Sequence, residues 1–348
     1  MFNTLQAGRA VAALLVVVYH LNALLSLPVY GGREVWAGFR SGHSGVNFFF
    51  VLSGFIIAWA HWIQVGDIAA LQPFLRKRIV RVYPVYWMVL ISIVPIYFLM
   101  PTFGTGYERD PGELLASFAL FPSENPPILA VAWTLQHEML FYFVFCTLFF
   151  SRRVGFAVVG LWTLACTVAL PFHLTFPYSF LFAPVNLLFV FGLLAFTILR
   201  HRPPAFPLLW LVTGILIFVL ASWLDVTNLM GVKLTMLLYG IGSLIAVIGA
   251  VAAEKVGAIA APRLLVAFGA ASYACYLVHF VVLSILAKLW FAVFGTRFDP
   301  IVPFVAMLAT AIATSVAFHR LVELPLLRMG QKLTTASEPN IGGPQARS

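Results

Sequence analysis

Long apolar stretches recur along the whole chain, and they constrain its fold more than any other feature. Of the 348 residues, 62% are hydrophobic and 9% are charged, whereas roughly a quarter of the residues in a soluble domain are charged. Stretches of about 20 apolar residues cross a bilayer as helices, because a helix satisfies its backbone hydrogen bonds internally. The sequence therefore predicts an all-α polytopic membrane protein.

Charged residues and Pro/Gly clusters divide these stretches into about ten predicted transmembrane helices. Basic residues concentrate in alternate connections, which places both termini in the cytoplasm by the positive-inside rule, and an even number of spans agrees with this. We expect a single membrane domain over residues 1–328 and a flexible, polar cytoplasmic tail over residues 329–348. The predicted spans are 8–27, 44–64, 83–101, 129–150, 154–172, 180–199, 205–224, 232–253, 264–288 and 301–322.

The first apolar stretch contains two ionisable residues, Arg9 and His20. They are eleven positions apart, close to three helical turns, so they project from the same face about 16 Å apart along the axis. Ionisable groups in a membrane are costly and are functional candidates that face a cavity. The alternative is structural: an arginine that reaches the lipid headgroups and a histidine bonded to a neighbouring helix.

The fourth predicted span carries Glu138 in the segment WTLQHEMLFYF. By the predicted topology this carboxyl lies about 14 Å below the outer boundary, close to the depth of His20. A carboxylate at this depth needs a partner or a proton. The adjacent His137 diverges from Glu138 by about 100° around the helix. We therefore assign Glu138 to the cavity and favour a structural role for His137.

A dense group of cations precedes the third span in the segment RKRIVRVYPVYW. Arg78 and Arg81 are three positions apart and share a helical face. With Arg9 and the cations Arg76 and Arg152, they could clamp the phosphates of a soluble nucleotide, because the guanidinium binds phosphate in bidentate geometry. The alternative is a topology signal that contacts anionic lipids.

Polar residues also mark the second and ninth spans. Ser44 and Asn47 open the second span, and Ser272, Tyr276 and His279 form an i, i+4, i+7 stripe in the ninth. Such residues line cavities or hold helices together. The three cysteines lie in apolar segments and indicate neither disulfides nor a metal site. The chain has no basic surface interleaved with aromatic residues, so nucleic acid is not an expected partner.

Together these residues form a buried histidine, a buried carboxyl at similar depth and an arginine-rich cytoplasmic mouth. A neutral imidazole in such a cavity could take the proton of an acceptor hydroxyl as its oxygen attacks a thioester, or could itself accept the acyl group. Glu138 could orient the imidazole or stabilise its cationic form, while the arginines hold an anionic donor. The pattern suits acyl transfer from a nucleotide-like donor to a hydroxyl.

In their order along the chain, these motifs resemble acyltransferase family 3, polytopic enzymes that O-acylate bacterial surface polysaccharides. The form of the first and fourth spans is most similar to the exopolysaccharide-modifying O-acetyltransferase branch. The matching pieces are Arg9 with His20, GVNFFFVLSGF, RKRIVRVYPVYW, WTLQHEMLFYF, SYACYLVH and VELP.

The resemblance implies a multi-pass acyltransferase of the bacterial inner membrane with cytoplasmic acetyl-CoA as donor and no metal. It implies that His20 is the catalytic base and Glu138 an essential acid, and that the acceptor is a hydroxyl of a polysaccharide or lipid-linked glycan. Where longer family motifs read W-[ST]-L-S-x-E, this chain has Gln136 and His137 before Glu138, which raises the question of His137 as a specificity residue. The implied donor-site residues are Arg9, Arg78 and Arg81, and the implied cavity residues are Ser272, Tyr276 and His279.

Three other classes remain open. A proton-coupled or lipid-linked-glycan transporter could use the buried His20 and Glu138, although the absence of internal repeats counts against it. An intramembrane protease is disfavoured because His137 and Glu138 do not belong to an HExxH motif and Ser53 does not lie in a G-x-S-x-G elbow. A structural or sensory membrane protein would not need the ionisable set.

Overall fold

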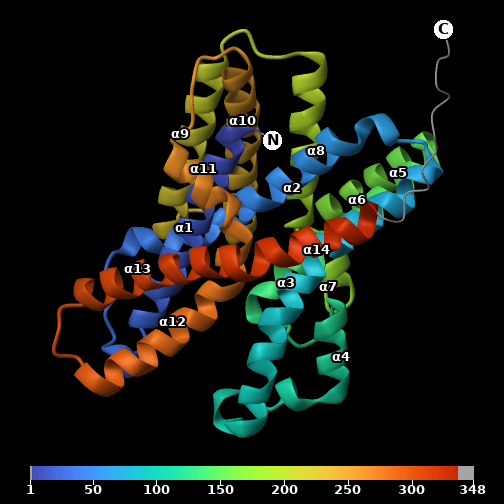
Figure 1. The fold of residues 1–348 in the computed structure, drawn as a ribbon. Coiled ribbons are helices and arrows are strands. Elements are labelled where there is room, and N and C mark those ends of the chain that lie inside the picture. Colours follow the sequence, from blue (N-terminus) through green and yellow to red (C-terminus); the bar gives the residue numbers. More distant parts are fainter. Residues whose placement is uncertain (1, 336–348) are drawn as a thin grey trace, which may run out of the picture.

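The computed structural model describes residues 2–335, and the regular structure of this part is helical throughout. Long helices pack side by side around α1, which contacts α2, α10, α11, α12 and α13 (Figure 1). The helices are α1 (Asn3–Leu25), α2 (Gly45–His61), α3 (Leu71–Leu99), α4 (Pro111–Ala119), α5 (Trp133–Phe150), α6 (Arg152–Val168), α7 (Tyr178–Leu181), α8 (Asn186–His201), α9 (Pro207–Val226), α10 (Val232–Lys255), α11 (Arg263–Ala270), α12 (Ser272–Phe294), α13 (Ile301–Phe318) and α14 (Leu324–Thr335).

Within residues 2–335, eight helical stretches are long and apolar enough to cross a membrane. This finding confirms the predicted all-α polytopic class. The predicted spans 129–150 and 154–172 correspond to α5 and α6, of 18 and 17 residues, which are not among the eight. The predicted number of ten spans is therefore not confirmed.

The third span begins earlier than the predicted residue 83. Helix α3 starts at Leu71 and includes Arg76, Arg78 and Arg81, so these cations lie on the helix itself and not in a preceding loop. Arg78 and Arg81 are three residues apart on this helix and share one face of it, so both line the same cavity.

The predicted ninth span is two helices, which corrects the single segment expected over 264–288. The chain breaks at Ala271, between α11 and α12. Helix α11 crosses the start of α1 so closely that a Cβ atom on Gly269 would lie 1.9 Å from the backbone oxygen of Gln6. This crossing fixes the direction of α11. The chain changes direction after it, and α12 begins at Ser272.

Small residues, Gly45 and Gly54, allow two other close crossings of helices. A Cβ atom on Gly45 would lie 2.2 Å from the backbone oxygen of Ala12, and one on Gly54 would lie 2.1 Å from that of Phe189. Glycine at such crossings lets helix backbones touch, as is common in membrane proteins. These contacts hold α2 between α1 and α8.

The last span continues as one long rod, in which α13 leads through a π-helical turn (His319–Glu323) into α14 (Figure 1). Within this turn, His319 Nδ1 lies 2.6 Å from a carboxylate oxygen of Glu323. Helix α14 packs across α3. The tail predicted from residue 329 is thus helical as far as Thr335, and residues 336–348 lie outside the described part.

Candidate active site

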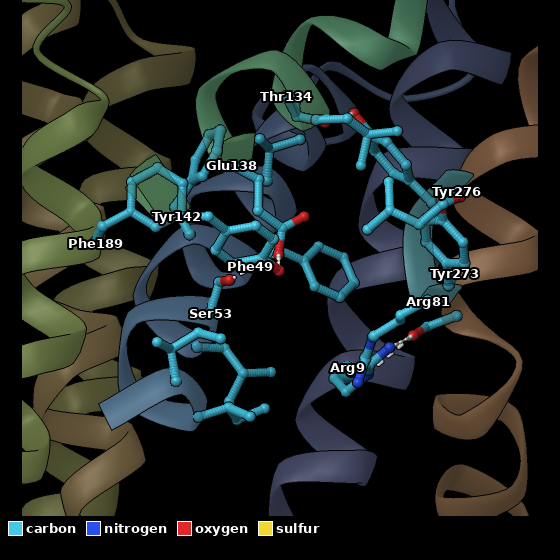
Figure 2. Close-up of a pocket in the computed structure, with 18 of the residues that line it drawn as sticks. Arg9, Phe49, Ser53, Arg81, Thr134, Glu138, Tyr142, Phe189, Tyr273 and Tyr276 are labelled. Atoms are coloured by element: carbon cyan, nitrogen blue, oxygen red, sulfur yellow. Dashed lines mark hydrogen bonds between the residues drawn. The ribbon is translucent and has the colours of Figure 1, made fainter. Parts of the chain in front are cut away.

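A cavity of about 110 Å³ lies where α1, α2, α3, α5, α8 and α12 converge. Figure 2 shows Glu138 and Tyr142 on one side, with Arg9, Arg81, Tyr273 and Tyr276 across from them. We call this cavity the arginine pocket. Its lining includes Arg9, Phe49, Ser53, Arg78, Arg81, Thr134, Glu138, Tyr142, Phe189, Ser272, Tyr273 and Tyr276.

Glu138 is the carboxyl group of the arginine pocket, as the sequence predicts. One of its oxygens accepts hydrogen bonds from the Ser53 hydroxyl at 2.8 Å and from the Tyr142 hydroxyl at 2.5 Å. Tyr142 lies one turn further along α5, so the i, i+4 spacing brings the two side chains together. These two hydroxyl groups hold the Glu138 carboxyl in place.

Three guanidinium groups line the pocket against this one carboxyl. Arg9 is buried and donates from Nε and from a terminal nitrogen to the Ser272 hydroxyl, at 3.0 and 2.9 Å. The guanidinium of Arg78 lies over the rings of Phe74 and Tyr142, and its buried Nε has no hydrogen-bond partner. The pocket thus has an excess of positive charge and a free donor, which suit an anionic ligand.

His61 also contacts the guanidinium of Arg78. A terminal nitrogen of Arg78 lies 3.3 Å from His61 Nε2, and an arginine can only donate. The Nε2 atom therefore accepts, and the proton of the ring is on Nδ1, which donates to the side-chain oxygen of Gln64 at 2.7 Å. His61 thus contacts Arg78, a residue that lines the pocket.

The predicted base His20 contacts His279 of α12. His20 Nδ1 lies 2.9 Å from the backbone oxygen of Val16 and 3.2 Å from His279 Nε2, while His279 Nδ1 lies 2.9 Å from the backbone oxygen of Cys275. Because a carbonyl only accepts, each Nδ1 carries a proton. His279 Nε2 is then an acceptor, and the lone pair of His20 is on Nε2.

The polar stripe of α12 faces α1, as its spacing predicts. Ser272 meets Arg9 and His279 meets His20, so the two ionisable residues of α1 do share a face. Between them, Tyr276 donates to the backbone oxygen of Val131 at 2.7 Å. The rings of Tyr276 and His279 are 6.0 Å apart. The stripe therefore runs from the arginine pocket to His20.

Other predicted site residues are placed elsewhere. His137 packs on Phe180 and its Nδ1 lies 2.9 Å from the side-chain oxygen of Asn186, outside the arginine pocket. Arg152 donates to the backbone oxygen of Val65. Its place near the connection between α2 and α3 follows from a fold that the sequence does not reveal. Arg76, Ser44 and Asn47 also do not line the pocket.

Glu138 and His20 are the pair on which the sequence hypothesis depends, and they have separate partners. Glu138 is held by Ser53 and Tyr142, whereas His20 is held by Val16 and His279. The place beside the imidazole that the sequence gives to Glu138 is thus occupied by His279. Tyr142 and Tyr273 are among the pocket residues that have no role in the sequence hypothesis. The i, i+4 spacing from Glu138 could have indicated Tyr142.

Metal coordination has no support in the described residues, since no group of three His, Cys, Asp or Glu side chains is placed to hold an ion. The polar features of the described helices are instead the arginine pocket and the contact between His20 and His279. Fold and site together define a polytopic membrane protein with an intramembrane polar site.

Comparison with known proteins makes this class specific. The sequence pattern of a family described as an acyltransferase domain matches residues 2–320, and the chain belongs to this family, acyltransferase family 3. It is therefore a membrane acyltransferase, as the sequence predicts, and the transporter alternative loses its support. No solved structure matches the chain significantly.

Curated relatives cover most of the chain. It is 31% identical over 311 residues to the exopolysaccharide production protein ExoZ of Rhizobium meliloti (strain 1021), which covers 84% of this chain and 92% of that protein. It is 28% identical over 342 residues to the acyltransferase MdmB of Streptomyces mycarofaciens, with 86% and 84% covered. A protein of the picA locus of Rhizobium radiobacter is 29% identical over 160 residues, which are 40% of this chain and 78% of that protein.

Proposed function

We propose that this chain transfers an acetyl group from cytoplasmic acetyl-CoA to a hydroxyl of an exopolysaccharide or lipid-linked glycan in the bacterial inner membrane. The contact between His20 and His279 carries the proposal, because it leaves the Nε2 lone pair of His20 available as a base. The name of the relative from Rhizobium meliloti supports a polysaccharide acceptor.

The arginine pocket suits the donor. Arg9, Arg78 and Arg81 would bind the phosphates of acetyl-CoA, since guanidinium groups form charge-assisted hydrogen bonds to phosphate. The distribution of basic residues places this end of α1 on the cytoplasmic side. The flexible pantetheine arm would then carry the thioester along the stripe of α12 toward His20.

The reaction needs one base that later acts as an acid. His20 Nε2 takes the hydroxyl proton as the acceptor oxygen attacks the thioester carbon. The new C–O bond forms, the C–S bond breaks, and the leaving CoA thiolate receives the proton from His20. His279 keeps the proton of His20 on Nδ1, so the base atom stays directed away from α12.

Glu138 has a role across the pocket in this scheme. Its carboxylate has no hydrogen bond to His20 in the described residues, so we assign it to stabilising the imidazolium through space and to orienting the arginines. A carboxylate can act on an imidazolium without contacting it, because charge interactions are strong in a site of low dielectric constant.

The test uses purified protein and acetyl-CoA labelled in the acetyl group, with de-O-acylated exopolysaccharide of the producing cell as acceptor. We expect label on the glycan with the wild type and none with His20→Ala. His173→Ala is a matched control, because His173 is exposed in the connection between α6 and α7. Label trapped on His20 would replace the direct transfer by a covalent route, and wild-type protein that does not engage acetyl-CoA would refute the proposal.

A further inference from the structure

A second cavity lies beside Tyr19, the residue next to His20 on α1, and shares no lining residue with the arginine pocket. It has a volume of about 310 Å³, which lies within the range of small-molecule sites. The cavity lies along the C-terminal end of α1. Arg9, which lines the arginine pocket, is eleven residues before His20 on the same helix. The lining residues are Tyr19, Asn22, Ala23, Ser26, Gly32, Glu34 and Arg40.

The position of Tyr19 connects this cavity to the base. The ring of Tyr19 is 5.0 Å from that of His20 and 5.5 Å from that of His43, in edge-to-face contacts. His43 Nε2 in turn lies 2.8 Å from a carboxylate oxygen of Asp225. Tyr19, which lines the second cavity, therefore contacts the ring of His20 directly.

The second cavity is polar, and its charges are balanced. Arg40 donates two hydrogen bonds to the Glu34 carboxylate, at 2.8 and 2.6 Å. The remaining polar groups are neutral hydroxyl and amide side chains. This contrasts with the arginine pocket, where three cations face one carboxyl. A cavity with paired charges and neutral donors and acceptors suits a polyhydroxyl ligand better than an anion such as CoA.

The cavity is also formed before any ligand binds. The side-chain oxygen of Asn22 accepts hydrogen bonds from the backbone N–H groups of Val35 and Trp36, at 2.8 and 3.3 Å. These bonds fasten the connection between α1 and α2 against α1. Gly32 has a φ angle of +66°, which lets the chain turn back toward α1. A preformed site loses little entropy on binding.

We propose that this cavity is the acceptor subsite and binds a saccharide unit of the glycan from the extracytoplasmic side. The inference rests on the proposed function, in which His20 activates an acceptor hydroxyl. The connection between α1 and α2 is extracytoplasmic by the positive-inside rule. Donor and acceptor then approach His20 from opposite sides of the membrane, and the acetyl group crosses at the imidazole.

Filling the cavity tests the proposal directly. Ala23 lines the cavity from an exposed position on α1, so Ala23→Trp places an indole in it without removing a core contact. Val29→Trp adds the same side chain in the same region but outside the cavity, at a position that is 71% exposed. The probe is a set of oligosaccharides from de-O-acylated exopolysaccharide of the producing cell, and binding to the full chain in detergent is measured by calorimetry.

A second pair consists of a milder variant, which changes only a polar contact in the cavity, and its control. Glu34→Gln breaks the pairing with Arg40, and we expect oligosaccharide binding about tenfold weaker, since a hydrogen bond to a charged group is lost. Arg33→Gln changes the neighbouring residue, which does not line the cavity, and should bind like the wild type. Because Glu34 is in a surface connection, this variant still folds if Ala23→Trp does not.

The proposal is supported if the wild type, Val29→Trp and Arg33→Gln bind the oligosaccharides while Ala23→Trp and Glu34→Gln bind them weakly or not at all. Equal binding by all five proteins, or no binding by the wild type, overturns it. Binding requires no acetyl-CoA. A wild type that binds oligosaccharide but never transfers acetyl would therefore refute the proposed function and leave the saccharide subsite standing.

Discussion

His279 Nε2 lies 3.2 Å from His20 Nδ1, and the backbone oxygen of Cys275 determines that this Nε2 accepts. The side chain of His279 is fully buried in α12. In the proposed reaction, with His20 as the base, a group that fixes the tautomer of His20 is a positioning residue. The backbone oxygen of Val16 and the imidazole of His279 both contact His20 Nδ1, and neither group is a carboxylate.

His279→Ala should lower kcat for acetyl transfer about 10- to 100-fold, part of the 10²- to 10⁴-fold that a general base supplies. The KM for acetyl-CoA should change little, because the arginine pocket does not include His279. His279→Gln retains a side-chain acceptor and should recover part of kcat. An equal loss in both variants, with a lower melting temperature in both, would indicate a structural role.

Arg9→Lys should raise the KM for acetyl-CoA about tenfold, since an ammonium group cannot reproduce the two hydrogen bonds to Ser272. Ser272→Ala should give a smaller increase, because it removes the acceptor and leaves the cation. Steady-state kinetics with varied acetyl-CoA separates KM from kcat. Arg153→Lys is the control, as Arg153 is exposed and outside the pocket. A fall in kcat at constant KM would contradict a donor-binding role for Arg9.

Tyr142→Phe should reduce kcat/KM about two- to tenfold, because it removes one of two hydrogen bonds to Glu138, worth about 0.5–1.5 kcal/mol. Glu138→Gln should reduce it further, since it removes the negative charge itself. Ser53→Ala with Tyr142→Phe should exceed the sum of the single changes, because both donors serve one oxygen. If Tyr142→Phe were as severe as Glu138→Gln, the tyrosine hydroxyl would have a role of its own.

Gly54→Ala should destabilise the fold by about 1–3 kcal/mol, because the new methyl group would lie 2.1 Å from the backbone oxygen of Phe189 and must push α2 from α8. Thermal unfolding of the detergent-purified protein measures the change. Gly160→Ala is a matched control within α6, where no atom lies within 4 Å of the added carbon. That variant should be neutral or slightly stabilised, since alanine favours helix. Similar melting temperatures for both variants would refute the close crossing.

Several features of the site follow from sequence because they depend on local geometry. Arg9 and His20 share a face through their spacing along one helix, and Ser272, Tyr276 and His279 form a stripe for the same reason. Arg78 and Arg81 of α3 reach one cavity because they are three residues apart on the helix. A helical period relates such residues whatever the helix packs against.

Contacts between residues on different helices are harder to predict from the sequence. Similar depth in the membrane favours Glu138 as the partner of His20. The structure gives His20 a different partner, His279, because α12, and not α5, packs along α1 at His20. Arg152 is cationic and near the predicted cytoplasmic boundary, but the packing of α6 turns it to the backbone of Val65.

The sequence by itself determined the class of the protein, its ionisable candidates and its family resemblance, because hydropathy and helical periodicity are local properties. The tertiary structure alone decided the break at Ala271, the pairing of His20 with His279, the hydroxyl groups that hold Glu138 and the separate cavity beside Tyr19. Each of these depends on which helices cross and how closely. Close crossings are set by contacts between residues far apart in the chain, such as Gly269 against Gln6.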